Sequence, residues 1–152
     1  MLKCDMLIDS NDIKSTLSKL KNQDNYYVLL DVTIIDYLKF PDITPSRFAV
    51  VYILRDKTFK NQISVKAFID DNTLTVDSIS DLFSSANWGE REAYDQYGIN
   101  FKGHPNLKRV LNHHQFVGHP LRKDYEITKG QICTQTEDLM DEMNPLLTSK
   151  GY

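Results

Sequence analysis

The first half of the chain shows two hydrophobic periods. Between residues 11 and 21, Ile13, Leu17 and Leu20 recur at helical spacing, which predicts a short amphipathic helix capped by Ser10 or Asn11. Four runs rich in apolar and β-branched residues then predict strands at 26–32, 47–54, 62–69 and 74–76. The polar stretch between the second and third runs predicts an antiparallel hairpin.

The run at 62–69 shows the clearest alternation of apolar and polar residues. Its odd-numbered positions, from Ile63 to Ile69, are apolar, whereas the even-numbered ones include Ser64 and Lys66. Since successive side chains of a strand point to opposite faces, we expect one buried face and one polar face, with Phe68 as the exception.

Two helices are predicted next. Ser78 and Asp81 resemble a capping box before an apolar stripe, which predicts a short helix over 78–86. Asn87 offers a cap for a second helix over 88–97, with Glu90 and Glu92 in its first turn and Gly98 as its stop. Arg91 and Asp95 are spaced i, i+4.

The chain beyond Gly98 loses its periodicity. Gly103, His104-Pro105, Gly118 and His119-Pro120 interrupt it, and this predicts an extended region in which only 107–111 could be helical. The polar tail regains some helical spacing over 136–147. We therefore expect an α/β domain at 1–101 and an extended interface segment with a tail at 102–152, within one structural unit.

Composition excludes several functions. A net charge of −3 and a pI near 5.8 give no basic field for nucleic acid. Cys4 and Cys133 form no CxxC pair, which suits a reducing compartment. The longest apolar runs are too short to span a bilayer, and the first residues do not resemble a targeting segment, so a soluble chain is expected. Abundant Lys, Asn and Ile suit an A/T-rich organelle genome.

Two groups of residues could carry chemistry. All four histidines (His104, His113, His114 and His119) lie within sixteen positions, but their spacing matches no HExxH or Cys/His zinc pattern. A small metal-dependent enzyme that uses them with Glu90 or Glu92 stays as one alternative. The acids of the 88–97 helix could supply an acid and a base, although a polar network that fixes the helix is the simpler interpretation. Sequence motifs of the main enzyme classes are absent.

Three ordered blocks carry a resemblance to a known family. They read WGEREAYDQYGINF (88–101), GHPNLKRVL (103–111) and GHPLRKD (118–124). Together they resemble subunit 9 of respiratory complex I (NADH:ubiquinone oxidoreductase), also called the thirty-kilodalton subunit or, in bacteria, the C subunit. The elements upstream of these blocks are similar to that family in order and character, so the resemblance covers roughly residues 10–126.

The resemblance implies a fold of the α+β class, a two-layer α/β domain with a mainly antiparallel sheet and flanking helices, followed by an extended C-terminal segment. It also implies a non-catalytic core subunit of the peripheral arm, with FMN and iron–sulfur clusters in partner subunits and no cofactor of its own. The expected partners are the quinone-site subunit 7 (the forty-nine-kilodalton subunit) and nearby iron–sulfur subunits. The expected location is the matrix side of the mitochondrial inner membrane, with the cytoplasmic face of a bacterial membrane as the alternative.

The resemblance assigns site residues as contacts rather than as catalysts. Glu90, Arg91, Glu92 and Asp95 would form the polar network of the helix, and Gly98 its left-handed stop. The extended contact segment would use the remaining signature residues: His104, Pro105, Arg109, Pro120, Arg122, Lys123 and Asp124. As a surface arginine, Arg122 is expected to matter more for assembly than for folding.

Some positions depart from the family pattern. Gln96 takes a usually apolar place, Tyr125-Glu126 replaces Phe-Pro, and the tail from Thr128 does not follow the family. We expect the first two to leave the fold intact. Related subunits also occur in membrane-bound hydrogenases, so the equivalent subunit of such an enzyme is a further alternative.

Overall fold

The structure is a computed structural model that describes residues 5–42, 44–126, 128 and 131. Its main sheet has four strands in the order β1-β4-β3-β2. The strands are β1 (Met6–Ile8), β2 (Val28–Asp36), β3 (Phe48–Arg55) and β4 (Gln62–Ile69). Neighbouring strands β2, β3 and β4 run antiparallel, whereas β1 joins the sheet parallel to β4.

The core lies on one face of this sheet. A 3-10 turn, η1 (Ser10–Asp12), leads into α1 (Ile13–Asn22), and the apolar stripe of α1 is buried, as its spacing predicted. Asp9 caps this start by accepting from the backbone N–H of Asn11, so the cap lies just before the predicted positions. From β3, alternate residues such as Val50 and Tyr52 join the same cluster.

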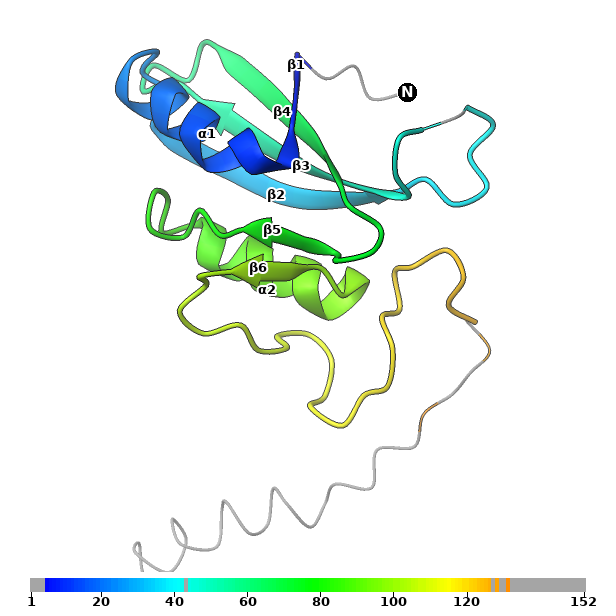
Figure 1. Cartoon of the computed structure of the whole chain (residues 1–152). Coiled ribbons are helices and arrows are strands. Elements are labelled where there is room, and N and C mark those ends of the chain that lie inside the picture. The colour runs from blue at the N-terminus through cyan, green and yellow to red at the C-terminus, as the bar shows by residue number, and fades with distance from the viewer. Residues whose placement is uncertain (1–4, 43, 127, 129–130, 132–152) are drawn as a thin grey trace, which may run out of the picture.

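A second, smaller layer completes the fold. β5 (Thr75–Asp77) and β6 (Asn100–Lys102) pair parallel in a sheet of their own, and α2 (Ala86–Tyr97) connects them (Figure 1). α2 packs against β2 at Gly89, where an added Cβ would lie 3.0 Å from Cβ of Val32. Glycine thus permits the close approach, and the two layers confirm the α+β class with its mainly antiparallel sheet.

The predicted helix over 78–86 is wrong. The chain forms turns there, and the Ser78 hydroxyl donates to Glu90 (2.6 Å) instead of capping a helix. α2 consequently begins at Ala86 without a side-chain cap, so Asn87 lies inside the helix. Glu90 and Glu92 fall in its second turn rather than its first.

Strand β4 also differs from its prediction. Lys66, expected on an exposed face, is only 7% exposed. Its Nζ lies 3.4 Å from the Tyr37 hydroxyl and 5.1 Å from the centroid of the Phe68 ring. Aromatic rings can thus pack against a long cationic side chain that the alternation of apolar and polar residues would place in solvent.

The remaining differences concern short elements. β2 continues to Asp36, beyond its predicted end, and neither β1 nor β6 was predicted. Residues 107–111 are not helical, because a buried carboxylate of α2 binds their backbone. The division at residue 101 into a domain and an interface segment stays a prediction, and the helical spacing over 136–147 lies outside the described residues. Within the described residues, no helix has the length and apolar character needed to cross a bilayer.

Candidate functional site

Residues 103–126, here called the extended segment, pass along α2 (Figure 1). The signature residues all belong to α2, its stop at Gly98 or this segment. Helix α2 supplies two buried carboxylates, Asp95 and Glu90. The donors to Asp95 come from the extended segment, whereas those to Glu90 come from the turn after β5.

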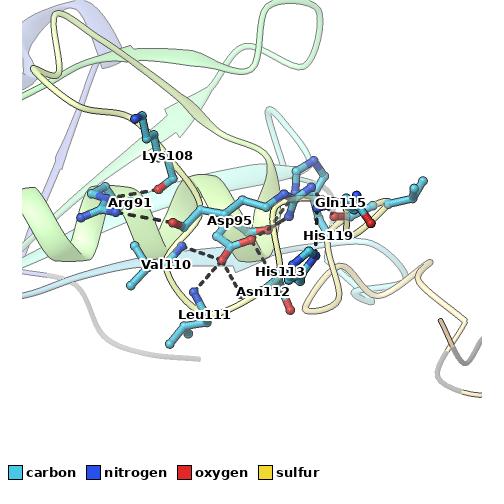
Figure 2. A network of polar contacts seen from close by, with 12 residues as sticks. Arg91, Asp95, Lys108, Val110, Leu111, Asn112, His113, Gln115 and His119 are labelled. Atoms are coloured by element: carbon cyan, nitrogen blue, oxygen red, sulfur yellow. Dashed lines mark hydrogen bonds and ion pairs between the residues drawn. The ribbon is translucent and has the colours of Figure 1, made fainter. Parts of the chain in front are cut away.

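Asp95 is the centre of the contact. Its carboxylate is fully buried and accepts backbone N–H bonds from Val110 (3.0 Å), Leu111 (2.8 Å) and Asn112 (2.8 Å), as Figure 2 shows. The Asn112 side-chain amide donates a further bond (3.0 Å), and Arg109 Nη1 donates an ion-paired one (2.7 Å). One carboxylate thus holds four consecutive residues of the extended segment in a non-helical turn.

The charge on Asp95 is stabilised by these donors. Burial alone would raise its pKa, but the hydrogen bonds from Asn112, Arg109 and Leu111 outweigh burial and hold the pKa well below its ordinary value. Asp95 is accordingly an ionised acceptor, and its lone pairs are directed at backbone N–H groups rather than at open solvent.

The two arginines near Asp95 have different partners. Arg91, at i−4, does not pair with Asp95 but donates to the backbone carbonyls of Lys108 (3.2 Å) and Arg109 (3.5 Å), with its guanidinium over the Trp88 ring. Arg109 reaches both Asp95 and the carbonyl of Gly118 (3.0 Å). Arg109 therefore links the first part of the extended segment to its second part through α2.

Glu90 is the second buried carboxylate. It accepts from the Ser78 hydroxyl (2.6 Å) and from the backbone N–H of Ile79 (2.7 Å), and so ties α2 to the turn after β5. Burial raises its pKa despite these bonds. His104 Nε2 lies 4.0 Å away and contacts the carbonyl of Asn87 (3.2 Å).

The C-terminal end of α2 receives the second part of the extended segment. Gly98 adopts a left-handed conformation (φ +74°), which confirms the predicted stop, and its N–H donates to the Tyr94 carbonyl. The next three carbonyls also have donors: His119 Nδ1 to Asp95 (2.9 Å), Leu121 N–H to Gln96 (3.2 Å) and Arg122 Nε to Tyr97 (2.6 Å). All four terminal acceptors of the helix are thus satisfied.

A third acid fixes the end of the extended segment to the sheet. Asp36 is ion-paired with Arg47 (2.8 Å) and accepts from the backbone N–H of Lys123 (2.9 Å), while Arg47 also pairs with Asp124 (2.7 Å). Burial would raise the Asp36 pKa, but Arg47 and the backbone donors lower it to about 2. No sequence motif indicated Asp36 or Arg47, because their relation to Asp124 spans most of the chain.

Two of the histidines, His113 and His114, lie side by side with ring centroids 4.2 Å apart, whereas His104 and His119 contact different carbonyls of α2. His104 Nδ1 accepts from the backbone N–H of Asn106, His113 Nδ1 accepts from that of Gln115, and His119 caps α2. Burial lowers the pKa of His119. In the part of the chain that the structure describes, no three metal-ligating side chains lie together as a metal site would require.

Apart from Gly98, which ends α2, the predicted site residues divide into two groups. One group makes bonds within the chain through side chains: Glu90, Arg91, Asp95, His104, Arg109, Arg122 and Asp124. In the other group, Glu92, Pro105 and Lys123 remain exposed, and Pro120 is half-buried beside His119. Whether any of them contacts a partner stays a prediction. Asn112, which directly follows the block 103–111, was missed as a donor, and Ser78 was expected to cap a helix rather than to donate to Glu90.

The departures from the family pattern fit the fold. Gln96 is buried, and its carbonyl is one of the capped acceptors. Tyr125 lies beside the Phe116 ring and against Gly118, where an added Cβ would be 2.9 Å from the tyrosine ring. Tyr125 therefore helps to shape the extended segment.

Comparison with known proteins identifies the group to which this arrangement belongs. Residues 6–131 match the family described as "Respiratory-chain NADH dehydrogenase, 30 Kd subunit". The C subunit of NADH-quinone oxidoreductase from Citrifermentans bemidjiense is 44% identical over 79% of this chain and 72% of the relative. The C subunit from Francisella tularensis subsp. novicida is 39% identical over 90% of this chain and 80% of the relative. A Bdellovibrio bacteriovorus chain, named as the C/D subunit, is 39% identical over 85% of this chain, which spans 22% of that relative.

Solved structures agree with these relatives. The trypsin-resistant fragment (1-134) of Nqo5 matches with a TM-score of 0.61 and 34% identity, over 66% of this chain and 80% of the fragment. A chain of the archaeal membrane-bound sulfane sulfur reductase matches with a TM-score of 0.68 at 22% identity, over 80% of this chain and 71% of its own, which shows a shared fold. The chain belongs to the family of the 30 Kd subunit of respiratory-chain NADH dehydrogenase, which is the C subunit of the NADH-quinone oxidoreductase also called complex I.

Proposed function

We propose that this chain is a non-catalytic core subunit of the peripheral arm of complex I, which supports the assembly of neighbours that carry electrons from NADH to ubiquinone. The observation that carries the proposal is the use of the signature acids. Asp95 and Glu90 are buried acceptors for backbone N–H groups and hydroxyls of this same chain. Carboxylates with such partners stabilise the fold of their own chain. A stable fold gives neighbouring subunits a well-defined surface to bind, which is the role of an assembly subunit.

The family resemblance suggests which neighbours surround the chain. We propose the quinone-site subunit 7 as the main partner, with iron–sulfur subunits nearby and FMN and the clusters held in those partners. The Bdellovibrio chain, named as the C/D subunit, supports a close neighbour, because two parts joined in one polypeptide are held near each other.

The proposed location follows from membership of the peripheral arm. The chain would lie on the matrix side of a mitochondrial inner membrane or on the cytoplasmic face of a bacterial one, attached through other subunits. Abundant Lys, Asn and Ile support a mitochondrial gene, whereas the named relatives are bacterial.

Native purification of the tagged chain from its own membranes tests this function. We expect the other peripheral-arm subunits to co-purify, with FMN and iron–sulfur absorbance and NADH:quinone activity in the complex. The isolated chain should show neither the absorbance nor the activity. Co-purification with hydrogenase or sulfur-reductase subunits would assign the chain to a related enzyme, and purification as a free monomer would contradict the proposal.

A further inference from the structure

A groove lined by apolar side chains and by two acids lies between β2 and α2, on a part of the surface that the network around Asp95 does not use. Two adjoining hollows share Asp31, Val32 and Glu92 in their walls. The first also includes Leu30 and Trp88, and the second is closed by Tyr97 and Leu121. We call these residues together the β2–α2 groove.

Its apolar side chains are unusually exposed for their size. Leu30 is 46% exposed, Trp88 62% and Leu121 53%, and all three border the same groove. Exposed clusters of this kind mark interaction surfaces more often than isolated apolar residues do. Tryptophan in particular is enriched among the residues that anchor protein interfaces.

Specific features of the fold hold these residues outward. An irregularity in the β2–β3 register between Leu29 and Asp31 leaves Leu30 without a counterpart on β3, so that Leu30 and Asp31 both face solvent. Leu121 is placed by its backbone bond to the end of α2. The groove is consequently formed by three separate parts of the chain, each fixed by backbone contacts.

The two acids select the kind of partner. Asp31 and Glu92 are exposed, and neither has an ion pair to any residue that the structure describes, whereas Asp36, Asp81, Asp95 and Asp124 each do. The nearest arginine of α2, Arg91, is directed to the carbonyls of the extended segment. A cationic group would complement the acids of the groove.

Backbone pairing is disfavoured as the way of binding. β2 is an edge strand of the main sheet, but its irregular register and the exposed charge of Asp31 are features that oppose the addition of another strand. α2 packs alongside β2 as well, at Gly89. Recognition through side chains is the mode that these features favour.

We propose that the β2–α2 groove binds a segment of a neighbouring subunit that presents an arginine or lysine flanked by apolar residues. The cation lies between Asp31 and Glu92, and the apolar side chains cover Leu30, Trp88 and Leu121. This inference rests on the proposed function, since it requires a neighbouring subunit, but it assigns a surface and a partner chemistry that the function alone does not.

Photo-crosslinking in the assembled complex tests the surface. A benzophenone amino acid replaces Trp88 in one variant and Phe59, which is 56% exposed in the β3–β4 connection, in a control. The complex is purified through a tag on another subunit, irradiated and analysed by mass spectrometry. We expect position 88, and not position 59, to crosslink to a segment in which a basic residue is flanked by apolar ones.

The absence of a crosslink from position 88, or a linked segment without a basic residue, would overturn the inference. Recovery of this chain with the complex would meanwhile leave the proposed function standing.

Charge reversal tests the role of the acids. The double variant Asp31→Lys/Glu92→Lys is compared with Asp24→Lys/Asp42→Lys, which makes the same change at two exposed acids outside the groove. Because like charges across an interface oppose association, we expect incorporation into the complex to fall about tenfold or more for the first variant only. Thermal unfolding of both purified variants provides the check that they fold. Equal incorporation of two folded double variants would overturn the inference.

Discussion

Gly98 and His119 lie so close together that a Cβ on residue 98 would be 2.5 Å from Nε2 of the histidine. The same atom would be 2.6 Å from Nη2 of Arg122. Both of these side chains bind carbonyls at the end of α2, so the end of the helix and the extended segment form a single packed unit. A glycine that the sequence marks as a helix stop therefore has a second role, which is to leave room for the extended segment.

Gly98→Ala should destabilise the chain more than Gly103→Ala does. Both glycines have positive φ, but only Gly98 has neighbours that an added Cβ would meet. We expect a loss of about 1–2 kcal/mol in the free energy of unfolding for Gly103→Ala, from backbone strain alone. For Gly98→Ala we expect about 3 kcal/mol or more, since displacement of His119 adds to the strain. Urea denaturation of both variants measures the difference, and equal losses would show that His119 is not held in place.

Asp95→Asn should be the most damaging single substitution among the signature residues. The three backbone N–H groups all donate to Oδ2, so the amide NH₂ of an asparagine would take the place of Oδ1 and oppose the donors of Arg109 and of the Asn112 side chain. Arg109 would also lose its ionic partner. Removal of one partner of a buried ion pair costs about 3–5 kcal/mol. Denaturation should show this loss, and limited proteolysis should cut the variant between residues 107 and 118. Resistance to proteolysis equal to that of the parent chain would contradict the role given to Asp95.

Glu90→Gln provides the matched contrast in the same helix. Burial already disfavours the charge on Glu90, and an amide can accept from Ile79 N–H while it donates to the Ser78 hydroxyl. We therefore expect the free energy of unfolding to change by no more than about 1 kcal/mol, the size of one neutral hydrogen bond. A loss as large as that of Asp95→Asn would show that Glu90 acts as an ionised group.

The stability of the chain should fall in acid because of Asp36. Its pKa is 3.8 in the unfolded chain and about 2 in the folded one, so the unfolded state binds the proton first. The contribution of Asp36, about 2 kcal/mol, is present above pH 5 and disappears as the pH falls toward 2. Asp95 acts in the same direction, whereas the raised pKa of Glu90 acts in the opposite one. Thermal unfolding of Asp36→Asn between pH 2 and 6 should show a weaker dependence on pH, and an unchanged slope would refute the assignment.

Arg122→Ala should affect folding as well as assembly. The sequence suggested a surface arginine, but its Nε donates to the Tyr97 carbonyl and its guanidinium lies over the Phe48 ring. Loss of a charged hydrogen bond predicts a decrease of about 1–3 kcal/mol in the free energy of unfolding. Lys123→Ala is the control, since Asp36 binds Lys123 through its backbone and its exposed side chain contacts only the Phe40 ring among the described residues, so it should lose no more than about 1 kcal/mol. Equal stability of Arg122→Ala and the parent chain would leave assembly as the only role of Arg122.

Local sequence patterns predicted the elements that depend mainly on interactions between residues close together in the sequence. The spacing of Ile13, Leu17 and Leu20, the β-rich runs of β3 and β4, and the stop at Gly98 all appear in the structure. The helix over 78–86 failed because the hydroxyl of Ser78, expected to cap it, bonds to Glu90 twelve residues away. The short strands β1 and β6 were missed because each consists of three residues and depends on a distant partner for its hydrogen bonds.

The sequence by itself determined which family the chain resembles and which residues are notable, because blocks 88–101, 103–111 and 118–124 occur in a specific order. Only the tertiary structure decided how they are used. Asp95 and Arg109 are fourteen residues apart, and Arg47 and Asp124 are seventy-seven apart, so no local period relates them. Their carboxylates and guanidinium groups meet only because the folded chain returns, far along the sequence, to the same place in the structure. That return buries Asp95 under the extended segment and leaves Glu92 in the open groove beside β2.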